Sequence, residues 1–234
     1  MVSNIVGVGC SFVQGSEIPK GKSFIDLLGG LNLGDEGIGN TGAVTRALMA
    51  DISRNSTIIF MPTGLNRVDI FKAEYNDVDI TPFVKIFPNI DPVKLGDMNK
   101  FNLERAMAPF VSLQTEVLNA TTNIINMQNF CKVNGHKLIM FPAFSREYTK
   151  KYFCNTIEGS FPHKIDWDKF ITIDGCSNFF DWTIKQSGAK VGLAMKDMQI
   201  NPSKYKIIGD WIMPRLHPSE KAHKLFAETI CKFL

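Results

Sequence analysis

The chain has 234 residues, which fits one domain with a sizeable core, and 44% of them are hydrophobic while 21% are charged. This balance is typical of a globular protein and excludes the disordered and membrane-spanning classes. The formal net charge is only +3, with Lys and Arg scattered among Asp and Glu, so nothing indicates a nucleic-acid partner.

The cysteines and the amino terminus bear on the compartment. The chain has five cysteines, widely separated and without a C-x-x-C pair: Cys10, Cys131, Cys154, Cys176 and Cys231. An odd, scattered set favours reduced thiols over a disulfide framework or a zinc site. No basic residues precede the first apolar segment, so a secretory signal is not expected. We therefore expect a protein that is cytoplasmic or otherwise lacks a signal peptide.

In the first part of the chain, short apolar segments alternate with helical patterns. The segments expected to be strands are 4–10, 31–33 and 57–61, and those expected to be helices are 24–28 and 42–52. Glycines or Pro62 end each strand, and polar loops follow. From 72 to 110 no clear period is present, and such long irregular segments are often lids or binding loops.

The same alternation continues to the end of the chain. An apolar stripe predicts a helix from 113 to the stop at Asn134 and Gly135, followed by a strand at 137–141. Residues 143–169 look irregular and aromatic, and 170–173 read as one more strand. Ser177 is a candidate cap for a helix that runs to Gly188, and Pro218 begins the last helix. Strand and helix alternation predicts a parallel sheet covered by helices on both faces.

The strand ends carry the residues with catalytic potential. In an open α/β sheet the active site lies at the carboxyl edge, and the strand ends deliver Ser11, Gly37 and Asn66 to it. Ser11 is the candidate nucleophile and His217, just before the last helix, the candidate base. The Ser11 and Gly37 N–H groups and the Asn66 amide could donate to the oxyanion formed on an ester carbonyl.

These residues resemble the conserved blocks of the SGNH (GDSL-type) hydrolases. Gly9-Cys10-Ser11-Phe12 with Gly15 is similar to the nucleophile block, with Cys10 where Asp is usual. The stretch 32–40 resembles the second block, whose glycine at the Gly37 position donates to the oxyanion. The stretch 64–66 resembles the third block, whose asparagine is the other donor. His217-Pro218-Ser219 before a terminal helix is a common form of the last block.

The resemblance implies a fold and an activity. The fold would be an α/β three-layer α/β/α sandwich with a central parallel sheet, the flavodoxin-like SGNH hydrolase fold, in one domain over 1–234 with irregular insertions near 72–110 and 143–169. The activity would be that of a serine esterase without a metal or organic cofactor. Its partner would be a small-molecule or glycan ester, with an acetyl ester on a carbohydrate preferred because the insertions are polar and aromatic. No nucleic acid, no membrane span and no particular oligomeric state is implied.

One position departs from the family pattern. The family usually places Asp three residues before the histidine, and here that residue is Pro214. Asp210, seven residues before His217, is a candidate to orient the imidazole, and a backbone carbonyl in a Ser-His dyad is the alternative. Because loss of the orienting carboxylate costs orders of magnitude in rate, a weakened or inactive SGNH-fold binding module stays open as a second reading.

Simpler readings of the same residues also stay open. Ser11 and His217 could serve only at helix starts, and Gly37 and Asn66 could be turn residues. An exposed Cys10 thiol could replace Ser11 as the nucleophile. The stretch from Gly15 to 21–23 resembles a phosphate-binding loop but has one residue too many, which argues against nucleotide binding.

Overall fold

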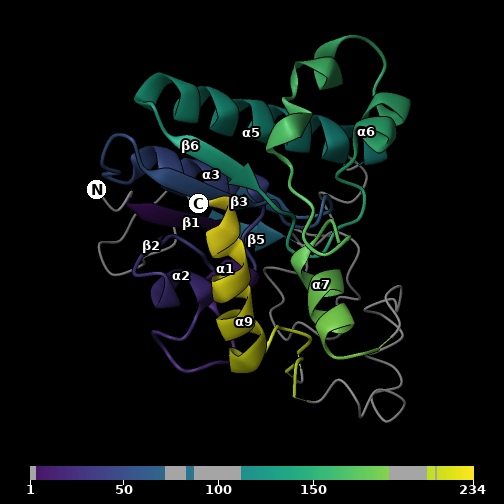
Figure 1. The fold of residues 1–234 in the computed structure, drawn as a ribbon. Helices are drawn as coiled ribbons and strands as arrows, with labels where there is room; N and C mark the ends of the chain where they lie inside the picture. The colour runs from purple at the N-terminus through teal and green to yellow at the C-terminus, as the bar shows by residue number, and fades with distance from the viewer. Residues whose placement is uncertain (1–3, 72–82, 87–111, 190–209, 214) are drawn as a thin grey trace.

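The computed structural model describes residues 4–71, 83–86, 112–189, 210–213 and 215–234, and its centre is a parallel sheet (Figure 1). The sheet has four strands in the order β2-β1-β3-β6. Their bounds are Ile5–Gly9 for β1, Leu31–Asn32 for β2, Thr57–Met61 for β3 and Lys137–Met140 for β6. All three strand pairs are parallel, with β1 between β2 and β3. The carboxyl ends of the strands therefore meet at one edge.

Helices cover both faces of this sheet, which confirms the expected three-layer α/β/α fold. On one face α3 (Asn40–Met49) packs against α5 (Leu113–Asn134), and on the other α2 (Phe24–Leu27) packs against α9 (Glu220–Ile230) (Figure 1). Because both faces are covered, every residue of β1 and β3 is buried. That explains why these strands read as continuous apolar runs. None of the described helices has the length and apolar character needed to cross a membrane.

Capping side chains set the ends of the helices. Ser112 Oγ accepts from Thr115 N–H at the start of α5, and Ser219 Oγ accepts from Ala222 N–H at the start of α9. The helix α7 (Phe179–Gln186) is capped by Asn178, and not by Ser177 as the sequence suggested. A 3-10 turn, η6 (Cys231–Phe233), follows α9.

The two segments that were expected to be irregular, 72–110 and 143–169, contain strands and helices. Strands β4 (Val68–Phe71) and β5 (Phe83–Ile86) form an antiparallel pair, and β5 lies inside the 72–110 segment. Apart from β5, that segment lies outside the described residues.

The 143–169 segment holds α6 (Lys150–Thr156) and two short 3-10 helices, η3 (Phe161–Lys164) and η4 (Trp167–Lys169). The expected strand at 170–173 is wrong, since only isolated bridges form there, at Phe170 and at Ile173.

The helices α2, α7 and α9 meet in an aromatic cluster that contains a buried histidine. The ring of Phe226 lies 4.2 Å from that of Phe179 and 5.0 Å from that of Phe24. His223 stacks on Phe24, and its Nδ1 accepts a hydrogen bond from Phe24 N–H at 3.1 Å. Burial in this cluster, and to a lesser extent the charge of His217, lowers the pKa of His223 to about 3.

This buried histidine predicts a pH dependence of stability. Between the ordinary pKa of 6.5 and the lowered value, the unfolded chain binds a proton on His223 that the folded protein does not. The free energy of unfolding therefore falls as the pH drops below 6.5, by about 2 kcal/mol at pH 5. Urea unfolding at pH 7.5 and pH 5 should show this loss in the His163→Gln control, where an exposed histidine is removed. His223→Leu should lose about 2 kcal/mol less between the two pH values. Equal losses in both variants would contradict the prediction.

Candidate active site

Strand β1 places Ser11 in the middle of the carboxyl edge. Ser11 is the first residue of the short helix α1 (Ser11–Gln14), two residues after β1 ends at Gly9. A backbone N–H in the first turn of a helix has no acceptor within that helix. The residue is 2% exposed, and the neighbouring Cys10 is fully buried. The Ser11 hydroxyl is the group that contacts His217.

The last residue of β2 and the loop that follows it hold α1 in place. Asn32 Nδ2 donates to the Val13 carbonyl at 3.0 Å and to Ser23 Oγ at 2.8 Å. Asn32 Oδ1 accepts from Gly34 N–H at 2.9 Å. A Cβ atom on Gly34 would lie 2.3 Å from the backbone nitrogen of Gln14, so only glycine permits this close approach. The position of the Ser11 helix is thus fixed by backbone and amide contacts.

A tight loop before α9 brings His217 to Ser11. Met213 N–H donates to the His217 carbonyl at 2.7 Å, and Ser219 N–H donates to the Trp211 carbonyl at 2.8 Å. In this loop His217 Nε2 lies 3.0 Å from Ser11 Oγ. The preceding Leu216 has a φ of 67°, a left-handed conformation that bulky residues rarely adopt and that is common near functional sites.

Glu17 occupies the other side of the imidazole. Its Oε2 lies 2.7 Å from His217 Nδ1, and both side chains are largely buried. An ionised carboxylate only accepts hydrogen bonds, so Nδ1 carries the hydrogen and Nε2 of the neutral ring offers its lone pair to Ser11 O–H. The Glu17 carboxylate also accepts from Arg215 N–H at 3.2 Å. Ser11, His217 and Glu17 thus form one hydrogen-bonded chain of hydroxyl, imidazole and carboxylate. This is the order of groups that activation of a serine hydroxyl requires.

The carboxylate beside the imidazole is that of Glu17, whereas the sequence suggested Asp210. Asp210 is exposed, and its backbone carbonyl accepts from Ser219 Oγ at 2.7 Å, which fixes the start of α9. Pro214, where the family pattern has Asp, lies outside the described residues. Glu17 follows Ser11 by six residues in a loop that begins at Gly15. The sequence does show a carboxylate in the loop that follows α1. Its contact with His217 could not be foreseen, because that contact depends on the tertiary fold.

The two expected oxyanion donors lie in the loops on either side of Ser11. Gly37 follows β2 and has a φ of 75°, which favours glycine, while Asn66 follows β3. The loops are tied together, because the Arg67 guanidinium donates to the Ile38 carbonyl at 3.2 Å. With β1 between β2 and β3, the sheet order places Ser11 between these two loops.

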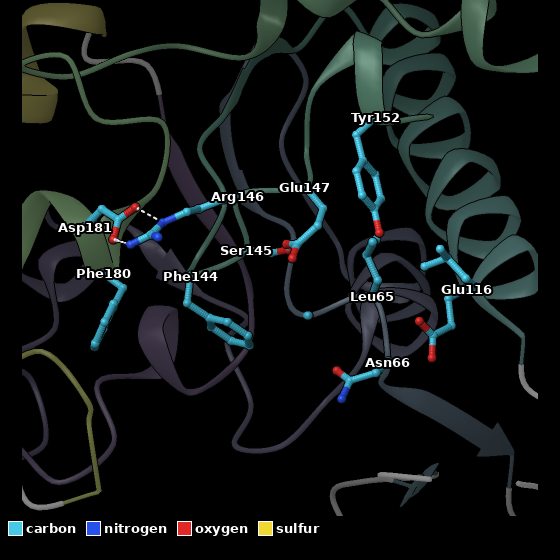
Figure 2. A pocket seen from close by; sticks show the side chains of 12 residues that line it. Leu65, Asn66, Glu116, Phe144, Ser145, Arg146, Glu147, Tyr152, Phe180 and Asp181 are labelled. Atoms are coloured by element: carbon cyan, nitrogen blue, oxygen red, sulfur yellow. Dashed lines mark hydrogen bonds and ion pairs between the residues drawn. The ribbon is translucent and has the colours of Figure 1, made fainter. Parts of the chain in front are cut away.

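A pocket of about 480 Å³ adjoins the Asn66 loop (Figure 2). Its described lining residues come from the loop after β3, the start of α5, the 144–152 segment and α7: Gly64, Leu65, Asn66, Leu113, Glu116, Phe144, Ser145, Arg146, Glu147, Tyr152, Phe180 and Asp181. The Phe144 ring lies 5.5 Å from that of Phe12, the residue next to Ser11. The pocket therefore borders the Ser11 site through an aromatic wall.

Charged groups in this pocket fall into two sets. Arg146 binds Asp181 through two hydrogen bonds of 2.6 and 2.5 Å, and this partner raises the pKa of Arg146. Glu116 and Glu147 lie on the other side of the pocket (Figure 2). Partial burial raises the pKa of Glu116. Burial is also the main cause that raises the pKa of Tyr152, and the two carboxylates raise it further. Hydroxyl, amide, carboxylate and aromatic groups thus line one cavity.

No set of three potential metal ligands gathers within the described ranges.

The sequence matches no protein-family model and no curated protein. Among solved structures, the chain is similar to a member of the lipolytic protein G-D-S-L family from Veillonella parvula DSM 2008. The two chains share 11% identity with a TM-score of 0.42, and the match covers 99% of this chain and 97% of that one.

Proposed function

We propose that this protein is a serine ester hydrolase in which Ser11 is the nucleophile and His217 the general base. The observation that carries the proposal is the chain of contacts from Ser11 Oγ to His217 Nε2 at 3.0 Å and from His217 Nδ1 to Glu17 at 2.7 Å. Helix-start residues without a catalytic role do not require a nucleophile, base and carboxylate in this order. The carboxylate also removes the main argument for an inactive module, which was the lack of an orienting acid.

The reaction runs in two balanced halves. Ser11 Oγ attacks the acyl carbon while its proton passes to His217 Nε2, and Glu17 stabilises the resulting imidazolium. The bond from the acyl carbon to the alcohol oxygen then breaks, and Nε2–H protonates the leaving alcohol. Water then attacks the acyl carbon of the acyl-enzyme and gives a proton to Nε2. The bond from the acyl carbon to Ser11 Oγ breaks, Oγ takes the proton back from Nε2, and the acid leaves.

The negative charge that develops on the carbonyl oxygen needs donors. The Ser11 N–H, the Gly37 N–H and the Asn66 amide are the groups proposed to supply them. Their support is the order of the strands, which places the two loops on either side of Ser11. Each well-placed donor contributes about 3 kcal/mol to the stability of the transition state.

The substrate is an ester of a hydroxyl-rich alcohol, and an acetyl ester of a carbohydrate fits best. The pocket beside Asn66 offers the Glu116 and Glu147 carboxylates as acceptors for sugar hydroxyls and the Phe144 ring as an apolar wall. Such a mixed lining suits a sugar better than a long acyl chain, because an acyl chain would desolvate the carboxylates without hydrogen bonds in return.

Hydrolysis assays test the activity and the substrate class together. Wild type should hydrolyse p-nitrophenyl acetate faster than the octanoate, and should release acetate from 6-O-acetylglucose, whose other hydroxyls are free to donate hydrogen bonds. Glu147→Gln should raise KM for the acetylated sugar about tenfold, since the charged acceptor for its free hydroxyls is replaced by a neutral amide oxygen. KM for p-nitrophenyl acetate should stay unchanged, and so should both KM values in Glu158→Gln, an exposed glutamate outside the pocket. No hydrolysis of any ester by folded wild type would contradict the proposed activity, and an unchanged sugar KM in Glu147→Gln would contradict the substrate assignment.

A further inference from the structure

Two buried polar side chains other than Ser11, His217 and Glu17 join the loops that carry the proposed oxyanion donors. Asn40 is 7% exposed and begins α3, directly after the loop that contains Gly37. Tyr148 is 5% exposed and comes from the 143–149 segment. Thr63, 1% exposed, follows β3 and lies three residues before Asn66. These three residues meet although they are far apart in the sequence.

Their contacts form a closed ring of three hydrogen bonds. Thr63 N–H donates to Asn40 Oδ1 at 2.9 Å. Asn40 Nδ2 donates to the Tyr148 hydroxyl at 2.8 Å. The Tyr148 hydroxyl donates to the Thr63 carbonyl at 2.6 Å. The backbone groups of Thr63 fix every direction in this ring, because an N–H can only donate and a carbonyl can only accept.

The ring stays intact over the working range of pH. Burial is the main cause that raises the pKa of Tyr148 above its ordinary value, so the hydroxyl keeps the proton that it donates to Thr63. Each polar atom in the ring has its partner, which is the condition under which a buried polar network makes a site rigid. Replacing such a network by well-packed apolar side chains is often neutral for stability. Stability alone therefore does not explain why polar side chains occupy these buried positions.

We propose that Asn40 and Tyr148 are positioning residues that hold the Gly37 and Asn66 loops at the separation required by the oxyanion hole. This inference rests on the proposed function. It follows from the placement of the ring, which links Asn40, three residues after Gly37, to Thr63, three residues before Asn66. Oxyanion donors must lie within a few tenths of an ångström of their optimum, and a displacement of about 1 Å costs roughly a hundredfold in rate.

Tyr148→Phe tests the proposal with little change in shape. The variant keeps the buried aromatic ring at position 148 but removes the hydroxyl that bonds the Thr63 carbonyl and Asn40 Nδ2. We expect kcat for p-nitrophenyl acetate to fall roughly 10- to 100-fold, with KM within about threefold of wild type. Asn40→Ala should behave alike. The double variant should lose about as much as the worse single variant, because the ring is broken only once.

A transition-state analogue separates positioning from general destabilisation. A trifluoromethyl ketone adds reversibly to Ser11 and forms an oxyanion, so its Ki should rise in Tyr148→Phe by the factor by which kcat falls. Thr121→Val is the matched control, because it removes a buried hydroxyl that donates to the Val117 carbonyl at 2.7 Å within α5. It should leave kcat and Ki unchanged.

The outcomes distinguish this inference from the function on which it rests. Esters hydrolysed by wild type, with kcat and Ki in Tyr148→Phe within threefold of wild type, would overturn the positioning role alone. An equal loss in Thr121→Val, or a change confined to KM, would also overturn it. Wild type that neither hydrolyses esters nor binds the ketone would contradict the proposed function, and the inference would fall with it.

Discussion

Ser11→Ala is expected to abolish ester hydrolysis, with kcat lowered at least about 10⁴-fold. The reason is that Ser11 supplies the hydroxyl that contacts His217, since its Oγ lies 3.0 Å from Nε2, while the thiol of the adjacent Cys10 is fully buried. KM should change little, because the oxygen contributes to bond formation more than to substrate binding. Steady-state hydrolysis of p-nitrophenyl acetate measures both constants.

Ser11→Cys is the companion variant for this test. It keeps a nucleophilic atom beside His217, so some acylation should remain, and a folded Ser11→Ala protein provides the background rate. Circular dichroism and thermal unfolding check that both variants fold. If Ser11→Ala kept more than about a tenth of the wild-type kcat, the nucleophile would be another residue.

Glu17→Gln is expected to have the second largest effect, a fall in kcat of roughly 10³-fold. The amide has the shape of the carboxylate but no charge, so it stabilises the imidazolium less. Its NH₂ group could also turn toward Nδ1 and favour the tautomer in which Nε2 carries the hydrogen. In that tautomer His217 cannot take the proton from Ser11.

Two further variants sharpen the Glu17 test. Glu17→Asp keeps the charge but shortens the side chain, so its kcat should lie between those of Glu17→Gln and wild type. Asp210→Asn should stay close to wild type, because the Asp210 contact near this site is made by its backbone carbonyl. A large loss in Asp210→Asn together with an active Glu17→Gln would assign the orienting role to Asp210 instead.

The fold was largely predictable from local signals. The strands β1 and β3 are fully buried apolar runs ended by glycine or proline, and their parallel pairing follows from the helices between them. The end of α5 at Gly135 was visible because the left-handed φ of 72° favours glycine at that position. These features depend on neighbours in the sequence, which a single chain displays.

Elements held by distant contacts were missed. Helix α6 has a threonine cap at Thr149, but aromatic residues and a neighbouring proline-containing turn hide its period. The 170–173 segment contains β-branched residues yet forms only isolated bridges, because Phe170 meets Met140 at the end of β6 and the chain then turns away. In such short segments tertiary contacts outweigh the intrinsic preference of β-branched residues for strands.

The candidate site divides in the same way. Ser11 and His217 could be selected because each lies next to a strand or helix end with a recognisable pattern. Glu17 could not be selected in this way, because its partner His217 lies 200 residues further along the chain and the two meet only in the folded protein. The ring of Asn40, Thr63 and Tyr148 likewise joins three separate segments, and each residue alone reads as an ordinary polar residue.

The most direct test of the central claim is covalent labelling with a fluorophosphonate, located by peptide mass spectrometry. We expect a single adduct on Ser11 in wild type, none in Ser11→Ala, and a strongly slowed reaction in His217→Ala and Glu17→Gln. An adduct on another residue, or no adduct on folded wild type, would contradict the assignment of Ser11, His217 and Glu17 as the catalytic triad.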